Sequence, residues 1–290
     1  MSIYERILVG LDGSEESFNA FKNALSLGKQ IKAEVSALYV LPISSEVSSA
    51  LSLFLGMKDL LKKGGEKVVK EAKSIAEEEG ISVKLIVEEG DPPSKIVDII
   101  YANNINLLVI GKSGKGGFEK ALLGSTASRV IGTSPVDVLV IPKNSKLNFK
   151  KILVPVDGSK YSEEAVERAI DFASYFKSSV ILLSVVEIPI EFYETSTEIS
   201  KILEHIKLEM EEFFRKMKMK FKEKILEVKS ILLEGVIEEK ILEKAKEEEV
   251  DIIIMGSHGK TGLKRLLMGS TTEKVLNLCN KPVLVVKREF

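Results

Sequence analysis

A glycine-rich stretch that occurs twice, each time between an apolar run and a helical pattern, is the feature that most restricts the fold of this chain. The first copy, GKSGKGGFEKALLGS, spans 111–125, and the second, GSHGKTGLKRLLMGS, spans 256–270. The four residues before each copy are continuously apolar, as in a strand buried on both faces. Each copy is therefore predicted to form the loop between a strand and a helix N-terminus. That arrangement presents unpaired N–H groups to an anion.

The two copies begin at 111 and 256, so they are 145 residues apart, which is half of the 290-residue chain. The same offset relates Asp12 to Asp157 and Val40 to Val185. An offset that stays fixed from end to end indicates duplication of a whole domain. The sequence thus predicts two domains, 1–146 and 147–290, each of ordinary single-domain size.

Within each half, strand patterns alternate with helical patterns. This order is typical of an α/β fold, here two repeated Rossmann-like domains, each with a five-stranded parallel sheet and helices on both faces. Long charged helices are expected over Lys58–Glu79 and Glu198–Val228, the second with Phe213 on its packed side. Gly64-Gly65 is expected to interrupt the first of them. The Ser-rich stretch 43–56 is compatible with a loop or with a short helix over the site.

Composition excludes several classes of function. The net charge of −1 provides no basic field for nucleic acid, and the apolar runs are too short to cross a membrane. One cysteine, Cys279, rules out an intrachain disulfide, and two histidines are too few for a metal cluster. The N-terminal MSIYERILVG has no signal-peptide layout, so a cytoplasmic protein is expected.

The glycine-rich copies are not the two common phosphate motifs. Neither contains G-x-x-x-x-G-K-[ST], and neither is G-x-G-x-x-G. A flexible surface loop would explain one copy, but two copies with identical spacing favour phosphate binding. Lys115 and Lys260 occupy matching places, where they either neutralise phosphate or are simply solvated.

Asp12 and Asp157 end the first strand of each half. In an open parallel sheet, ligands bind beyond the carboxyl ends of the strands, so an Asp there suits ribose hydroxyls or a phosphate-bound Mg²⁺. The alternative is a capping Asp in an Asp-Gly-Ser turn, with Ser14 as the helix N-cap. His258 beside Ser257 does not by itself make a catalytic dyad.

With these residues assembled, the whole chain resembles the universal stress protein family in a tandem form. Nucleotide-binding members of that family carry G-x-x-G, nine residues and then G-[ST], and both copies match this pattern. The resemblance implies a sheet of order 3-2-1-4-5 with ATP across strands one and four. The implied nucleotide-binding residues are Leu11, Asp12, Val40, Gly111, Gly114, Lys115, Gly124, Ser125 and Thr126, and then Val156, Asp157, Val185, Gly256, Gly259, Lys260, Gly269, Ser270 and Thr271.

The resemblance also implies roles and partners. Asp12 and Asp157 would contact ribose and phosphate-bound Mg²⁺, while the valines that end strand two would contact adenine. Strand five, Val138–Ile141 and Val283–Val286, would make an intrachain pseudo-dimer, which leaves a homodimer and a protein partner open. The implied function is an ATP-binding stress sensor or signalling protein with little or no hydrolysis. The alternatives are a slow Mg-dependent ATPase or nucleotidyl transferase, and a nucleotide-free protein-interaction module.

Overall fold

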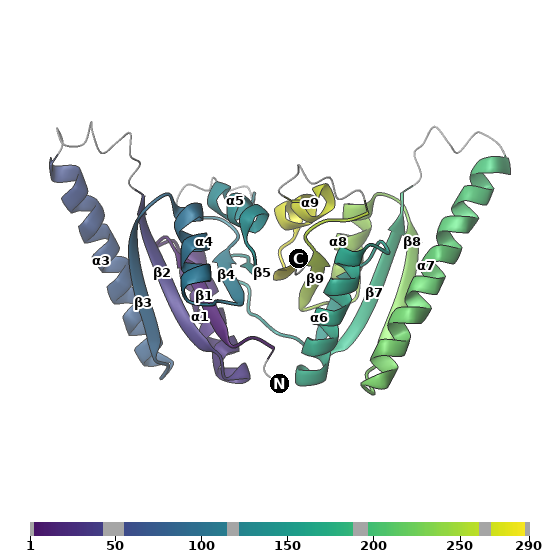
Figure 1. The fold of residues 1–290 in the computed structure, drawn as a ribbon, viewed down its shortest axis with the longest axis horizontal. Coiled ribbons are helices and arrows are strands. Elements are labelled where there is room, and N and C mark those ends of the chain that lie inside the picture. The colour runs from purple at the N-terminus through teal and green to yellow at the C-terminus, as the bar shows by residue number, and fades with distance from the viewer. Residues whose placement is uncertain (1–2, 43–54, 115–121, 188–196, 261–267, 288–290) are drawn as a thin grey trace. The chain divides into compact units, whose positions relative to one another are not determined.

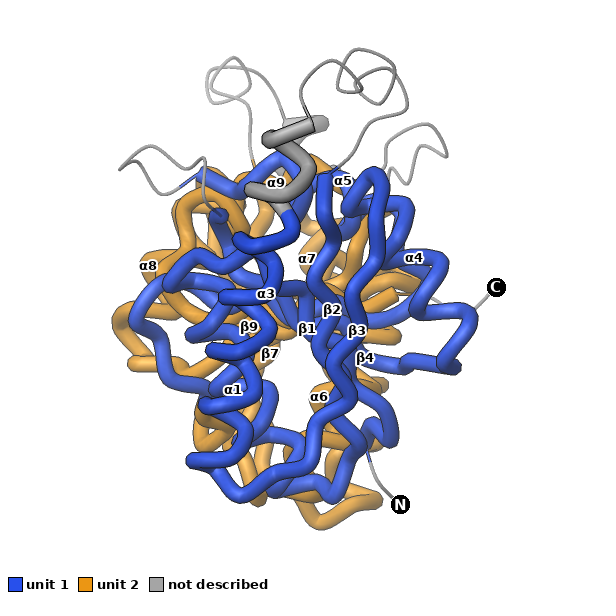
Figure 2. The backbone as a smooth tube through the Cα atoms, turned by 90° about the vertical axis from the view of Figure 1, so that its left-hand side faces the viewer, with its two compact units in different colours: residues 1–147 blue, residues 148–290 orange. Residues whose placement is uncertain are grey.

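The chain divides into two compact units, Met1–Leu147 and Asn148–Phe290 (Figures 1 and 2). A computed structural model describes residues 3–42, 55–114, 122–187, 197–260 and 268–287. The stretch expected at 43–56 as a loop or short helix lies mostly outside these ranges, and so does Lys115. Among the described residues, no helix is both long and apolar enough to cross a bilayer.

Unit 1 is a five-stranded parallel sheet with four described helices. In chain order its elements are β1 (Arg6–Leu11), α1 (Glu15–Ile31), β2 (Glu34–Pro42), α3 (Leu55–Glu78), β3 (Val83–Gly90), α4 (Pro92–Ala102), β4 (Leu107–Gly111), α5 (Ser125–Thr133) and β5 (Asp137–Ile141). The strands pair in the order β3-β2-β1-β4-β5. This is the order that the family resemblance implied, and its direction reverses between β1 and β4.

Unit 2 repeats the plan. Its elements are β6 (Lys151–Pro155), α6 (Lys160–Phe176), β7 (Ser179–Val186), α7 (Thr197–Glu223), β8 (Val228–Glu234), α8 (Ile237–Glu247), β9 (Ile252–Gly256), α9 (Ser270–Leu278) and β10 (Val283–Val286). Its strand order, β8-β7-β6-β9-β10, is again 3-2-1-4-5, and all of its described pairs are parallel. The predicted α/β class is confirmed.

The first helix of each unit begins where a serine caps it. Ser14 Oγ accepts the Ser17 N–H at 3.1 Å, and Ser159 Oγ accepts the Ser162 N–H at 3.2 Å. Each contact satisfies one of the N–H groups that the first helical turn leaves unpaired. The expectation that Ser14 is an N-cap is therefore confirmed, and the chain turns sharply from strand to helix at the carboxyl edge of the sheet.

Side chains along β2 point alternately to the two faces of the sheet. Leu38 and Val40 line a hollow together with Ile96 of α4, whereas Tyr39 packs against α3. A Cβ added at Gly65 would lie 2.8 Å from Tyr39 Cε1, so only glycine allows this close approach. The expected interruption at Gly64-Gly65 is therefore wrong: α3 is continuous, and Gly65 serves its packing.

The long helix α7 is one-sided, as predicted, but its limits and its inner face differ in detail. It ends at Glu223, because the exposed Ile225 has φ 58° and cannot continue a right-handed helix. Met210, Phe214, Met217 and Phe221 are buried along it. Of the two adjacent aromatic residues, Phe214 is the buried one, whereas the predicted Phe213 is half-buried.

The segment that follows β5 is fastened to α1 within unit 1. Asn19 Nδ2 donates to the carbonyl oxygens of Pro142 and Ser145, both at 3.1 Å. Asn23 Oδ1 accepts the Leu147 N–H at 2.6 Å, and Asn23 Nδ2 donates to Ser145 O at 3.1 Å. Two asparagines one helical turn apart thus satisfy the backbone of residues 142–147.

Candidate functional site

The point where strand order reverses in unit 1 brings two predicted motifs together. β1 ends directly before Asp12, and β4 ends at Gly111 beside it in the sheet. A Cβ added at Gly111 would lie 3.1 Å from the backbone carbon of Glu16, and one added at Gly114 would overlap Asp12 Oδ2. The glycines therefore let the loop after β4 lie directly against Asp12 and the start of α1.

A hollow of about 1150 Å³ opens at this edge of unit 1. It gathers every described residue that was predicted for the first site, namely Leu11, Asp12, Val40, Gly111, Gly114, Gly124, Ser125 and Thr126. The described residues predicted for the first site are therefore neighbours in the folded unit.

The lining of the hollow is apolar on one flank and polar on the other. Leu38 and Val40 of β2 face Ile96 of α4, and these supply hydrocarbon. Asp12, Ser113 and the start of α5 supply polar groups from the other flank. The arrangement suits a ligand with a flat apolar end and an anionic end.

The N-terminus of α5 lies in this lining and has no side-chain cap. Gly124, its N-cap, has φ −64° and ψ 149°. Ser125, Thr126 and Ala127 follow it and also line the hollow. Because an uncapped first turn leaves N–H groups directed outwards at the positive end of the helix dipole, this lining can hold an anion.

The carboxylate of Asp12 is already engaged at the start of α1. Its Oδ1 accepts the Ser14 N–H at 2.9 Å and the Ser14 hydroxyl at 2.6 Å. The capping alternative is thus part of the geometry, and the same carboxylate lines the hollow. The charge of Asp12 also affects Tyr39 on the other face of β2. The pKa of the Tyr39 hydroxyl is raised mainly by burial and further by the negative charge of Asp12.

Unit 2 places its own predicted residues in the same arrangement. Asp157 follows β6, and its Oδ1 accepts the Ser159 N–H at 3.0 Å while its Oδ2 accepts the Lys260 N–H at 2.7 Å. A Cβ added at Gly256 would lie 2.7 Å from the carbonyl oxygen of Tyr161, so this loop also passes close to its first helix.

The remaining predicted residues of unit 2 lie at the same edge of the sheet. Val156 donates its N–H to Leu183 O at 2.8 Å, which joins the end of β6 to β7, the strand that carries Val185. α9 begins after Gly269 without a side-chain cap, as α5 does, with Ser270 and Thr271 in its first turn.

A family model described as "Universal stress protein family" matches residues 3–142 and again 148–287. The chain belongs to the universal stress protein family. Universal stress protein MJ0531 of Methanocaldococcus jannaschii is 38% identical over 146 residues, which cover 50% of this chain and 86% of that protein. Universal stress protein Slr1230 of Synechocystis sp. is 25% identical over 98% of this chain and its whole own length.

Solved structures agree with the fold. The crystal structure of a universal stress protein from Archaeoglobus fulgidus covers 99% of this chain and 97% of its own, with a TM-score of 0.72 and 24% identity. At that identity the likeness concerns the architecture alone. Universal stress protein MJ0577 of M. jannaschii is 37% identical over 161 residues, covering 49% of this chain and 96% of that protein.

Several lining residues of this universal stress protein were missed by sequence reasoning. Leu38 lies two residues before the predicted Val40, so strand periodicity could have found it. Pro92 and Ile96 come from a helix that no motif marks, and only the folded chain brings them to the hollow. The lining residues that had not been predicted are Gly10, Ser17, Leu38, Pro92, Ile96, Ile110, Ser113, Leu122, Leu123, Ala127 and Val130.

The histidines and the cysteine form no further site in the described ranges. His205 is exposed on α7 and lies 3.4 Å from Glu209, and His258 Nδ1 lies 3.1 Å from Ser257 Oγ. Cys279 is buried at the C-terminal end of α9. No group of three or more His, Cys, Asp or Glu side chains suited to a metal occurs in the part of the chain that the structure describes.

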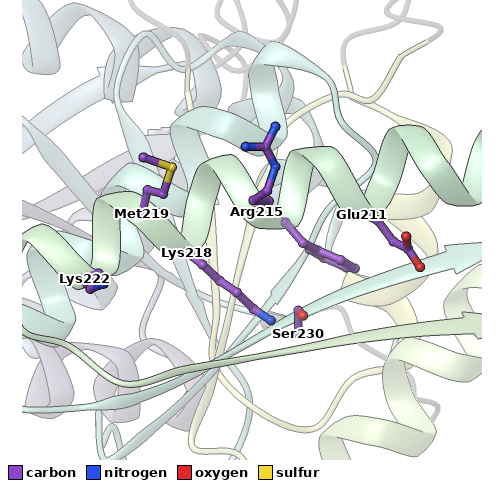
Figure 3. Close-up of a pocket in the computed structure, with 7 residues that line it drawn as sticks. Glu211, Arg215, Lys218, Met219, Lys222 and Ser230 are labelled. Atoms are coloured by element: carbon purple, nitrogen blue, oxygen red, sulfur yellow. The ribbon is translucent and has the colours of Figure 1, made fainter.

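A second hollow of about 410 Å³ lies on unit 2, away from the loop motif (Figure 3). It runs along α7, where Phe214 and Met219 supply its apolar surface and Lys218 points toward Ser230 of β8. It contains none of the residues predicted for the site. Because this second hollow is less than half as large and lies away from the loop motif, the hollow of unit 1 is the better candidate for a small ligand.

Proposed function

We propose that this universal stress protein binds ATP together with Mg²⁺ in each unit and acts as a nucleotide-dependent stress sensor or signalling protein with little or no hydrolysis. The observation that carries the proposal is the hollow of unit 1, where an apolar flank, a carboxylate and an uncapped helix N-terminus meet. These three features match the base, the sugar or metal, and the phosphates of a nucleotide.

Each part of the nucleotide has a proposed place in unit 1. The base lies between Val40 of β2 and Ile96 of α4, where the lining is apolar. The phosphates lie against Gly114, Gly124 and Ser125, where glycine lets a ligand approach the backbone closely. In unit 2 the matching residues are Val185, Gly259, Gly269 and Ser270.

Mg²⁺ fits this site as a companion of the nucleotide. A single carboxylate, from Asp12 or Asp157, faces each loop, and Mg²⁺ is commonly held by one or two carboxylates plus phosphate oxygens and water. When bound, the metal supplies charge neutralisation to the phosphates. The protein's own residues orient it and leave the rest of its coordination to the ligand.

Weak hydrolysis follows from the lining. Among the described residues around the hollow, Asp12 is the only titratable side chain, and Ser14 already occupies one of its oxygens. No group there is free to activate water or to stabilise a transferring phosphoryl group. Turnover faster than about one per second, an ordinary enzyme rate, would instead favour the Mg-dependent ATPase or transferase.

Calorimetry of the intact chain with Mg-ATP tests the binding proposal. Wild type should show two sites, Gly124→Val should lose the first, and Gly269→Val should lose the second. Gly124 is the cleaner probe, because a Cβ there comes no closer than 3.6 Å to any atom of the described residues, so lost binding reports on the ligand. Gly64→Ala, whose Cβ would meet no described atom within 4 Å, is the matched control. A wild type that binds no nucleotide would leave only the interaction module.

The sensing role and the pairing of strand five belong to the same proposal. Proteins retained on the immobilised chain with and without Mg-ATP should differ if a partner reads the nucleotide. A charge placed in strand five of each unit should disturb the intrachain pseudo-dimer, and Val140→Lys together with Val285→Lys tests it by solution size and melting. Identical partner sets in the two conditions would contradict nucleotide-dependent signalling.

A further inference from the structure

The carboxylate of Asp157 lies in the glycine loop that the proposed nucleotide phosphates would use. Its Oδ2 accepts the Lys260 N–H at 2.7 Å, and a Cβ added at Gly259 would lie 2.6 Å from the same oxygen. Its Oδ1 meanwhile holds the Ser159 N–H at 3.0 Å. One carboxylate therefore joins the start of α6 to the loop after β9, and the second glycine of the motif makes room for it.

A backbone N–H that holds a carboxylate cannot also hold a phosphate oxygen. Hydrogen bonds to a charged acceptor are stronger than neutral ones, so the Asp157 contact competes with an incoming anion for the Lys260 N–H. Two anions crowded at one loop also repel each other. A bound divalent cation removes both difficulties, because it can take Asp157 as a ligand and attract the phosphates at once.

The side chain of Lys260 adds a second contact, and this one reaches α7. Lys260 Nζ lies 3.5 Å from Glu209 Oε2, and its Cε lies 3.5 Å from where a Cβ on Gly158 would be. Glu209 also lies 3.4 Å from His205. Lys260 thus passes over the turn after β6 and ties the loop to the long helix.

Unit 1 lacks the helix half of this arrangement. The position that matches Glu209 is Gly64, which has no side chain to pair with a lysine. Asp12 Oδ2 lies against Gly114 as Asp157 Oδ2 lies against Gly259, since a Cβ at either glycine would overlap the carboxylate. The contact that Glu209 makes therefore has no counterpart at the matching position of unit 1.

We propose that Asp157 serves as an internal anion that occupies the backbone N–H of Lys260 until a metal-bound phosphate displaces it, and that Glu209 reinforces this contact through the Lys260 side chain. We call Asp157, Lys260 and Glu209 the latch. The latch makes ATP binding at the second site depend on Mg²⁺. This inference rests on the proposed nucleotide function, and it regulates the same site.

Hydrogen exchange in the nucleotide-free protein tests the latch without any ligand. In Asp157→Asn the Lys260 amide should exchange about tenfold faster, because the charged acceptor is lost. Glu209→Gln should raise the rate roughly twofold, as expected for an exposed ion pair. Glu204→Gln, an exposed change one turn earlier on α7, is the control and should change nothing. Unaltered exchange at Lys260 in both latch variants would overturn the proposal.

Metal-free ATP binding then tests the regulation, measured in a Gly124→Val background so that the second site is observed. Glu209→Gln should bind ATP about two- to fivefold tighter without Mg²⁺. Asp157→Asn should bind metal-free ATP tighter still and lose the gain that Mg²⁺ gives to the parent. Equal affinities in parent and Glu209→Gln would refute the reinforcement. If no variant binds ATP, the nucleotide function fails, while the exchange rates still decide whether the latch exists.

Discussion

In unit 1 the ring of Tyr39 on β2 lies against Gly65 of α3, whereas the matching positions of unit 2 hold Ser184 on β7 and Met210 on α7. All four residues are buried. The bulk that the sheet supplies in one unit is supplied by the helix in the other. Both units thus fill the space between strand two and the long helix. The large side chain comes from the strand in unit 1 and from the helix in unit 2.

A second difference between the units concerns the ion pair that links the two helices on the other face of each sheet, α4 and α5 in unit 1 and α8 and α9 in unit 2. Arg129 of α5 donates to both oxygens of Asp91, at 3.0 and 3.1 Å, while in unit 2 Lys274 of α9 donates to Glu238 at 2.7 Å. The acid has moved from the N-cap of α4 to the first turn of α8, and the cation has changed type. The link between the two helices is kept although neither partner is.

The largest expected effect concerns the packing of Tyr39 against Gly65. Tyr39→Ser should lower the free energy of unfolding of unit 1 by about 3 kcal/mol through a cavity, and Gly65→Met by about 2 kcal/mol through overlap with the ring. The double variant, which copies unit 2, should recover at least half of the summed loss. Urea unfolding read by hydrogen exchange in unit 1 measures this. Strict additivity of the two losses would break the comparison.

The first glycines of the two motifs should differ by a smaller amount. Gly256→Ala places a Cβ 2.7 Å from the Tyr161 carbonyl oxygen and should cost about 2 kcal/mol. Gly111→Ala meets Glu16 backbone at 3.1 Å and should cost about 1 kcal/mol, because a shift of a few tenths of an ångström relieves it. Thermal melts of both variants provide the check. A larger loss of stability for Gly111→Ala than for Gly256→Ala would contradict the closer approach of Gly256 to the first helix of its unit.

A gain is expected where unit 1 has a glycine and unit 2 has Glu209. Gly64 lies inside α3, and none of the placed residues comes within 4 Å of a Cβ added there. Gly64→Ala should therefore stabilise unit 1 by up to about 1 kcal/mol through helix propensity and a less flexible unfolded chain. Gly65→Ala is the paired control and should destabilise, since Tyr39 fills that space. Equal effects of the two substitutions would mean that the packing against Tyr39 is not specific.

The smallest effect concerns the link between α4 and α5. The hydroxyl of Ser94 first, and then Arg129, lowers the pKa of Asp91. Because the folded pKa is the lower one, the stabilisation is present above the ordinary carboxyl pKa and disappears as pH falls through the folded value. Arg129→Gln should cost no more than about 0.5 kcal/mol at pH 7, since the pair is largely exposed, and nothing below pH of about 2. An equal cost at both pH values would exclude the charge as its source.

Much of the fold was accessible from the sequence, because the repeat gives each strand twice. Val109 and its neighbours read as a buried strand, and the second copy removes the ambiguity of a single short apolar run. The order of the strands in the sheet came from the family resemblance, because the alternation of strands and helices along the sequence does not determine it. Asp12 and Gly114 were expected at one edge of the sheet, and the structure brings them into contact.

What escaped prediction depends on contacts between elements. Gly65 read as a helix breaker because its partner, Tyr39, is distant in sequence. Phe213 and Phe214 are adjacent aromatics on a helix, and only the placement of α7 on its sheet selects the second as the buried one. Ile96 enters the hollow from a helix without any motif. In each case local preference was overruled by packing.

The fastening of residues 142–147 to α1 has a practical consequence for fragment design. A recombinant first half that stops at Ile141 would discard the carbonyl groups to which Asn19 donates and the Leu147 N–H that Asn23 Oδ1 accepts, so the amide oxygen of the buried Asn23 would lose this partner. A fragment that runs through Leu147 keeps the hydrogen bonds of Asn19 and Asn23. Chimeras that combine halves of different tandem relatives should therefore take residues 142–147 from the same protein as the first half.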